Sequence, residues 1–189
     1  MQHYSIEDYI KSIIQIIEKD VNHDGSIRSE LEKTPHRVAK SYKELFAGYN
    51  MRPEDVLSKM ALHNAEHNDY IWLKNIEFNS MCEHHMLPFT GTVDICYTPK
   101  QHIVGLSKLN RIVDVFAKRL QLQERLTFQI ANSIFEHLDC DGVGVRIRAK
   151  HFCMVMRGVN KMHGIMETMH FCGSFKTHRK TDFLSGLTT

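Results

Sequence analysis

The apolar residues near the start of the chain recur at the spacing of an α-helix. Isoleucines stand three or four positions apart between Ile10 and Ile17, and the residues before them, Ser5–Asp8, have the form of a capping box. A polar turn is expected at 22–25, and Thr34–Pro35 predicts the start of a second helix, with the threonine as its cap. The chain is therefore expected to begin with two amphipathic helices.

A third, shorter helix is expected from Pro53, because proline followed by two acidic residues favours the first turn of a helix. The polar run at 64–69 is typical of a linker. We therefore expect two parts in this chain, an N-terminal helical region at 1–65 and a second, catalytic domain at 66–189.

From Tyr70 onward the hydrophobic period shortens to two, which predicts strands at 71–78 and 89–97. One face of the second strand carries an almost continuous apolar row, made of Phe89, Gly91, Val93, Ile95 and Tyr97. A row of this kind is expected to face a hydrophobic core.

Helical spacing returns at 107–120 and again at 124–138. Alternation then resumes over 142–157, and a last strand is expected to reach Phe175. The long strand would place three chemically interesting residues on one face: His151, Cys153 and Arg157. The order of helices, two strands, two helices and two strands predicts an α+β fold with an antiparallel four-stranded sheet.

Composition limits the choice of partners and compartment. With 24 Lys and Arg against 22 Asp and Glu, the formal net charge is only +2, so no overall field favours nucleic acid or a membrane. The chain shows neither a leader-like start nor a long apolar run, and we expect a cytoplasmic protein. Five cysteines at irregular spacing fit reduced thiols or metal ligands better than disulfides.

The densest group of reactive side chains is the run Cys82-Glu83-His84-His85. Cys82 and His85 are close enough for one turn to direct both at the same metal ion, and Cys153 offers a third soft ligand. Three ligands leave a position for water, which is typical of a catalytic zinc and not of a structural one. His84 and His151 are then candidates for proton transfer, since imidazole exchanges protons near neutral pH.

An alternative explanation of the cysteines stays open at this point. Free cysteine is among the most buried residue types, so Cys82 and Cys153 are also explained as ordinary core thiols. The spacing alone does not decide, because the meeting of two remote segments is inferred from the sequence.

A second candidate site begins at Gly105, where Ser107 is expected to cap the following helix. Lys108 and Arg111 would project from its first turn, where free N–H groups and the helix dipole favour phosphate. Arg157 would bring a further cation towards the metal. A plain capped helix with solvated cations explains the same residues.

Three segments, SMCEHHMLPFTG, VGLSKLNRIVDVFAKRLQLQERLT and HFCMVMRGV, resemble the signature blocks of the GTP cyclohydrolase I family in order and separation. LEKTPHRVAKSYKELFAGY resembles the family's N-terminal helix, and THRKTDFL resembles its C-terminal end. The resemblance implies a tunnelling fold, in which units of two helices and four strands from several subunits form a barrel. Such barrels commonly assemble as a homodecamer of two pentamers, with active sites between subunits.

The resemblance also implies a zinc-dependent hydrolase that converts GTP to 7,8-dihydroneopterin triphosphate and formate, the first step of tetrahydrofolate and pterin biosynthesis. Matching positions give Cys82, His85 and Cys153 as the zinc ligands. His84, His151 and Ser107 correspond to the catalytic residues.

The guanine edge is assigned by the same match to Gln123 and Glu124. A carboxylate suits this base because it accepts hydrogen bonds from both N1–H and the 2-amino group. The match assigns the ribose and triphosphate to Ser107, Lys108, Arg111 and Arg157. Taken alone, Gln123 and Glu124 are also residues that the first turn of a helix favours.

The segment at 160–169 departs from the family pattern, which has a Ser/Thr-rich run here. Thr168 keeps a hydroxyl, whereas Gly164, Met166 and Met169 replace the others, and methionine does not hydrogen-bond as a hydroxyl does. We therefore expect the subunit packing or the pocket wall to differ. The alternatives are a paralogue with another purine nucleotide substrate, a non-catalytic purine- or pterin-binding module, another enzyme of the same fold, and a small zinc-stabilised interaction domain.

Overall fold

The computed structural model describes residues 4–21, 25–57, 62–63 and 69–187. The chain divides into two compact units between Ala47 and Gly48. Most of the turn expected at 22–25 and of the linker expected at 64–69 lies outside the described residues. Within the described part of the chain, no helix has the length and apolar character needed to cross a membrane.

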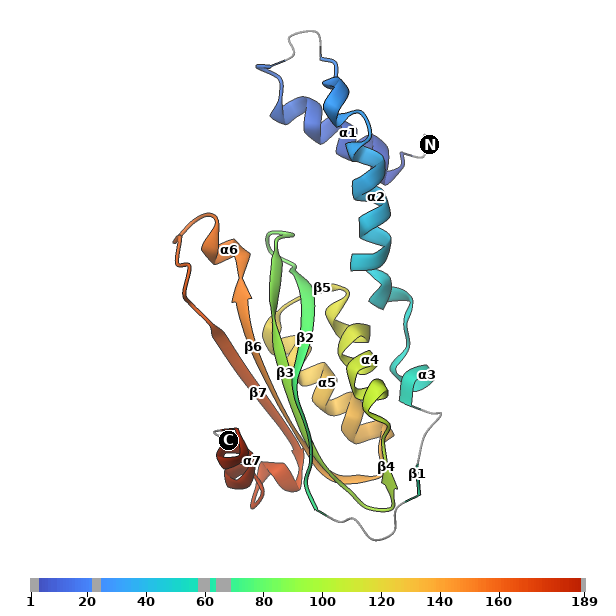
Figure 1. The fold of residues 1–189 in the computed structure, drawn as a ribbon, viewed down its shortest axis with the longest axis vertical. Helices are drawn as coiled ribbons and strands as arrows, with labels where there is room; N and C mark the ends of the chain where they lie inside the picture. Colours follow the sequence, from blue (N-terminus) through green and yellow to red (C-terminus); the bar gives the residue numbers. More distant parts are fainter. Residues whose placement is uncertain (1–3, 22–24, 58–61, 64–68, 188–189) are drawn as a thin grey trace. The chain divides into compact units, whose positions relative to one another are not determined.

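The first unit contains a pair of helices, α1 (Ile6–Ile17) and α2 (Thr34–Leu45), with the short 3-10 helix η1 (Ser29–Leu31) between them (Figure 1). The capping box is confirmed, because the Ser5 hydroxyl accepts from the N–H of Asp8 and the Asp8 carboxylate accepts from the N–H of Ser5. The cap predicted at Thr34 is wrong: the helix begins one residue earlier than expected and Lys33 is its N-cap.

The second unit begins at Gly48, within η2 (Ala47–Asn50), which leads to α3 (Pro53–Leu57). The side chain of Leu57 is 1% exposed and belongs to the main core, and α3 packs against the helices α4 and α5. α3 therefore belongs to the second compact unit. A two-stranded ladder pairs β1 (Leu62–His63) with β4 (His102–Ile103).

A five-stranded sheet forms the centre of the second unit, in the order β5-β2-β3-β6-β7. Its four long strands are antiparallel neighbours: β2 (Ile71–Cys82), β3 (Pro88–Pro99), β6 (Cys140–His151) and β7 (Met166–Gly173). The expected four-stranded antiparallel sheet is thus confirmed. The two-residue strand β5 (Leu120–Gln121) adds a short parallel pair beside the end of β2.

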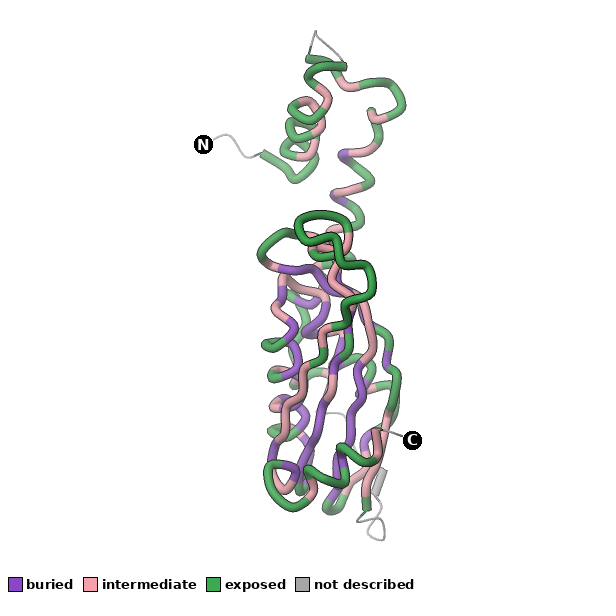
Figure 2. The backbone as a smooth tube through the Cα atoms, turned by 90° about the vertical axis from the view of Figure 1, so that its left-hand side faces the viewer, coloured by how far each residue is buried: buried purple, intermediate pink, exposed green. Residues whose placement is uncertain are grey.

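Two helices, α4 (Leu106–Ala117) and α5 (Gln123–His137), connect β3 to β6 and cover one face of the sheet (Figure 1). The apolar row predicted on β3 faces them, since Phe89, Val93, Ile95 and Tyr97 all belong to the main core. Figure 2 shows the buried residues concentrated in the strands of the sheet and in the helices that cover it. The tunnelling-fold unit, with two helices between the second and third long strands, is therefore confirmed.

The opposite face of the sheet carries a smaller aromatic cluster, formed by Cys96, Phe175 and Phe183 with partly buried neighbours that include Trp72. Phe175 lies in η3 (Ser174–Lys176) and Phe183 in the terminal helix α7 (Lys180–Gly186). The C-terminal segment thus packs at one end of the sheet, and the turn between β2 and β3 lies at the other end (Figure 1).

Candidate metal centre and active site

Two thiols and one imidazole meet where β2 ends. One ligand atom from each of Cys82, His85 and Cys153 lies within 4.8 Å of those of the other two. The Sγ atom of Cys82 is 3.7 Å from Nδ1 of His85. The two remote segments therefore converge, as the metal hypothesis requires and the core-thiol alternative does not.

A tight turn after Cys82 places the first two of these side chains together. The N–H of Cys82 donates to the carbonyl of Leu87 at 2.9 Å, and the N–H of Met86 donates to the carbonyl of Cys82 at 2.8 Å. Met86 has a φ of 51°, in the left-handed region that few non-glycine residues adopt. This turn brings His85 back beside Cys82.

Cys153 reaches the cluster from a short helix, not from a strand. The strand predicted over 142–157 is too long, because β6 stops at His151 and α6 (Phe152–Val155) follows. The last pair between β3 and β6 is Phe89 with His151. The next residue on β3 is Pro88, which has no N–H to continue the ladder.

His151 is held beside the cluster by two contacts. Its Nε2 lies 2.8 Å from Oε1 of Gln123, and its ring stacks on Phe89 with 4.6 Å between the ring centroids. Burial lowers the pKa of His151, and the nearby Glu124 carboxylate opposes this shift more weakly. Glu124 itself is exposed in the first turn of α5.

The side chain of Gln123 is buried, which the sequence did not lead us to expect. Its amide bonds to groups of the same chain, including the carbonyl oxygens of Ile147 and Met166. Its contact with His151 was likewise not expected from the sequence. A glutamine opening a helix usually indicates a solvated first turn, so no pattern in the sequence distinguished this one.

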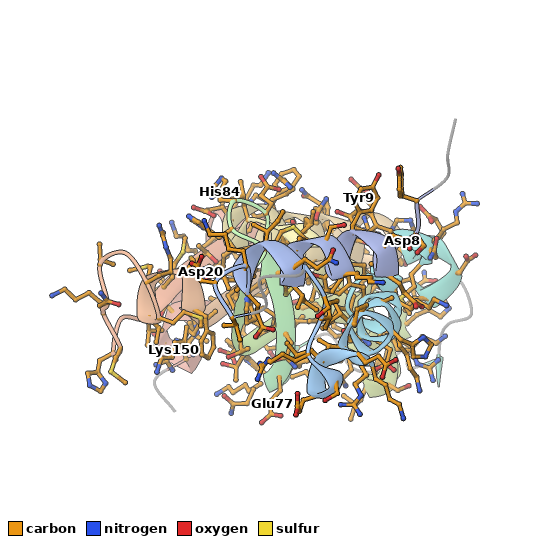
Figure 3. All side chains as sticks on the ribbon, turned by 90° about the horizontal axis from the view of Figure 1, so that it is seen from above. Asp8, Tyr9, Asp20, Glu77, His84 and Lys150 are labelled. Carbon is orange, nitrogen blue, oxygen red and sulfur yellow. The ribbon has the colours of Figure 1, made fainter. Side chains whose placement is uncertain are left out.

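The remaining residues of the cluster are more exposed. His84 is exposed and lies at the periphery in the view of Figure 3, next to the ring of His85. Arg157 Nη1 lies 3.4 Å from Nε2 of His85, so this cation does reach the candidate metal centre. Burial raises the pKa of the Cys153 thiol, the adjacent Cys82 raises it further, and Arg157 acts in the opposite direction.

The cations predicted on α4 are not brought to this cluster within one chain. The C-terminal end of α4 leads into β5, which pairs with the end of β2 at Cys82. A helix of 12 residues is about 18 Å long, so its first turn, with Ser107 and Lys108, lies far from the cluster (Figure 1).

The expected capping role of Ser107 is wrong, because the helix begins at Leu106 and Gly105 is its N-cap. The Nζ of Lys108 donates to the carbonyl of Val56 at 3.1 Å. Arg111 is exposed one turn further along the helix.

An α+β unit that gathers two thiols, an imidazole and a half-buried histidine at the end of its sheet has a group of side chains compatible with an enzymatic metal site. The sequence profile of GTP cyclohydrolase I matches residues 6–186. This chain is therefore a member of the GTP cyclohydrolase I family.

Individual relatives agree with this assignment. A protein named GTP cyclohydrolase 1 from Rickettsia bellii (strain OSU 85-389) is 48% identical over 174 residues, covering 92% of this chain and 88% of that protein. A protein of the same name from Campylobacter jejuni (strain RM1221) is 44% identical over 175 residues, covering 93% of this chain and 89% of that protein.

Among solved structures, the apo form of the archaeosine synthase QueF-Like aligns with a TM-score of 0.46 at 16% identity, over 55% of this chain and 93% of that one.

Proposed function

We propose that this protein is a zinc-dependent GTP cyclohydrolase I, which hydrolyses GTP to 7,8-dihydroneopterin triphosphate and formate. The observation that carries the proposal is the meeting of Cys82, His85 and Cys153 in a chain of this family. Two thiolates and an imidazole are a donor set that suits zinc. In the part of the chain that the structure describes, no fourth Cys, His, Asp or Glu joins the group, which fits a catalytic site with room for water.

When bound by these three residues, zinc would supply Lewis-acid activation of water for attack on the imidazole ring of guanine. The chain's own residues bind the base and move the protons. The exposed carboxylate of Glu124 would accept from N1–H and the 2-amino group, and His151 and His84 would transfer protons at the ring that opens. Release of formate and closure of a pterin ring would make this the first step of pterin and tetrahydrofolate synthesis.

The proposed active site lies between copies of the chain, in a homo-oligomer that we expect to be a decamer of two pentamers. Support comes from the first turn of α4, with Ser107 and Lys108, which lies far from the metal cluster of the same chain; Arg111 follows one turn later. A neighbouring copy would supply these groups for the ribose and triphosphate, and Arg157 would come from the chain that holds the metal.

Turnover of GTP tests the chemistry. Zinc-loaded protein should release formate and yield a fluorescent pterin after oxidation. Cys153→Ala should lose both zinc and turnover, whereas His84→Ala should keep zinc and lose turnover, because His84 is assigned to proton transfer alone. Absence of formate and pterin from fully zinc-loaded protein would contradict the proposal.

The shared site has its own test. Cys153→Ala and Lys108→Ala chains, each inactive alone, should regain part of the activity when they are co-expressed and assemble together. Intact sites form only where a metal-binding chain meets a neighbour with Lys108. Failure of mixed oligomers to recover any activity would contradict a site between subunits.

A further inference from the structure

The side-chain amide of Gln123 has hydrogen-bonding partners from several elements. The residue opens α5 and is 1% exposed. Its Nε2 lies 3.1 Å from the carbonyl oxygens of Ile147 and Met166, and 3.1 Å from Oγ1 of Thr168. Because carbonyl oxygens accept and never donate, the amide nitrogen must face them, and the amide oxygen must face the other way.

The amide oxygen faces His151. Oε1 of Gln123 is 2.8 Å from Nε2 of the imidazole ring. An amide oxygen has no hydrogen to give, so the hydrogen of this bond comes from Nε2. A neutral imidazole carries one ring proton, and this bond keeps it on Nε2 and leaves Nδ1 as an acceptor.

Other contacts fix the pair further. The rings of Phe89 and His151 are 3° from parallel, which restricts the tilt of the imidazole. The Thr127 hydroxyl donates to the main-chain oxygen of Gln123 at 2.7 Å and lies 2.6 Å from the Thr168 hydroxyl. Thr168 therefore donates to Thr127 and keeps its own oxygen free to accept from the amide. These hydrogen bonds are all consistent with one orientation of the Gln123 amide.

We propose that Gln123 is a positioning residue that holds His151 with its proton on Nε2, so that His151 exchanges protons with the substrate through Nδ1. The family match assigns Gln123 to the guanine edge, but both amide hydrogens are used inside the chain, and none is left for a base. Reading of the guanine edge then falls to Glu124, which is exposed. The proton-transfer role of His151 rests on the proposed function, whereas the position of its ring proton does not.

The first measurement is made on the protein with Gln123 and its hydrogen-bonding partners unchanged. Nitrogen-15 NMR of histidine-labelled, zinc-loaded protein, sedimented in mildly alkaline buffer without GTP, separates the two neutral tautomers, because protonated and bare ring nitrogens resonate far apart. The signals of His151 are those lost in His151→Gln. We expect a protonated Nε2 and a bare Nδ1. The opposite tautomer would overturn the proposal, whatever the result with GTP.

The second measurement compares two variants in the same buried network. Gln123→Met keeps the length of the side chain but removes its polar groups. It should lower kcat roughly 10- to 100-fold, the usual effect of losing a group that orients an active-site side chain. The KM for GTP should change less than about threefold, and the tautomers of His151 should become mixed.

The matched control is Thr127→Val, one turn further along α5, which removes bonds to the main chain of Gln123 and to Thr168. It leaves in place the two carbonyl acceptors of the Gln123 amide, on Ile147 and Met166. It should lower the unfolding midpoint as Gln123→Met does, because both leave buried polar groups unpaired. Its kcat should stay within about twofold of the unaltered chain, with the His151 tautomer retained.

Two results with these variants would overturn the positioning role. A raised KM with preserved kcat in Gln123→Met would show that Gln123 binds the substrate. Equal losses of kcat in both variants, with the tautomer unchanged in each, would leave Gln123 a purely structural role. If the unaltered chain does not turn over GTP, the proposed function fails, and the tautomers of the two variants still decide whether Gln123 orients His151.

Discussion

The two ends of the central sheet use cysteine in opposite ways. At one end, the thiols of Cys82 and Cys153 lie within reach of each other and of an imidazole. At the other end, Cys96 is 0% exposed and packs among aromatic rings in the cluster with Phe175 and Phe183. Burial raises the pKa of the Cys96 thiol far above its ordinary value, so it stays protonated and unreactive.

The contrast shows that surroundings, and not residue type, separate a candidate ligand from a core residue. The same strands serve both groups. β2 carries Trp72 and Cys82, and β3 runs from Phe89 beside His151 to Cys96 beside Trp72. At the metal end, the tight turn after Cys82 and the short helix α6 bring the side chains of Cys82, His85 and Cys153 together. At the aromatic end Cys96 packs against Phe175 and Phe183, whose rings stabilise the fold and offer no ligand atom to an ion.

The largest expected difference between the two ends appears on removing one thiol from each. Cys82→Ala should lose bound zinc and lower kcat roughly 10³-fold or more, because the groups acting on the reacting atoms are lost. Cys96→Ala should keep zinc and turnover, and should lower the free energy of unfolding by only about 1–2 kcal/mol for the small cavity it leaves. Metal analysis and formate release check both. Full zinc content in Cys82→Ala would contradict the assignment of the metal end.

The reverse effect is expected from Phe183→Ala at the aromatic end. Phe183 is 0% exposed, and its ring stacks on that of Trp72 at 5.1 Å between centroids. Removing it should cost about 3–5 kcal/mol of stability. Trp72 is the only tryptophan in the chain, so its fluorescence during urea unfolding reports this region directly.

The folded fraction of Phe183→Ala should still bind zinc with unchanged stoichiometry, because the metal cluster lies at the other end of β3. All samples are compared at one protein concentration, since assembly adds to apparent stability. A variant that keeps the unfolding midpoint of the unaltered chain would show that the aromatic cluster contributes little.

Periodicity alone predicted most of the fold. The row from Phe89 to Tyr97 faces the core because alternation on a half-buried strand leaves little choice. The same rule failed beyond His151, where alternation continues in the sequence but Pro88 ends the ladder of the neighbouring strand. Pairing of that kind depends on a segment more than 60 residues away, which a local pattern does not contain.

The candidate site was predictable as a set of residue types but not as an arrangement. Cys82 and His85 share one turn, so their proximity followed from spacing. The contact between Gln123 and His151 joins a helix to a strand end, and only the packing of α5 on the sheet creates it. The resemblance assigned the first turn of α4 to the ribose and triphosphate of a site between subunits, and within one chain the length of the helix keeps this turn away from the cluster.

A smaller difference between the two ends of the sheet is expected in the reactivity of their thiols, and it can be measured without mutation. Cys153 is only half-buried, whereas burial raises the pKa of Cys140 to about 12 and that of Cys96 still further. After zinc is removed by a chelator, Cys153 should be alkylated at least about 100-fold faster than Cys96 or Cys140. Bound zinc should protect it. Peptide mapping by mass spectrometry measures each rate, and equal rates with and without zinc would contradict Cys153 as a ligand.

The smallest expected effect concerns an exposed ion pair at the metal end. Arg125 of α5 donates two hydrogen bonds, at 2.6 and 2.9 Å, to the carboxylate of Glu83, which lies in the turn between the candidate ligands Cys82 and His85. Because the pair is solvent-exposed, Arg125→Ala should lower the thermal midpoint by no more than about 3 °C. Zinc content should not change, since neither residue is among the three candidate ligands.

The pH dependence of this pair has a definite sign. Hydrogen bonding from Arg125 lowers the pKa of Glu83 below its ordinary value of 4.5, so the folded chain binds this proton less readily than the unfolded chain. The contribution of the pair is therefore complete above the ordinary pKa and is lost as the pH falls through the lowered one. Thermal unfolding of zinc-free Arg125→Ala and of the zinc-free unaltered chain should differ near neutrality and converge in acid. A difference that persists at the lowest pH would show that Arg125 stabilises the turn by packing and not by its charge.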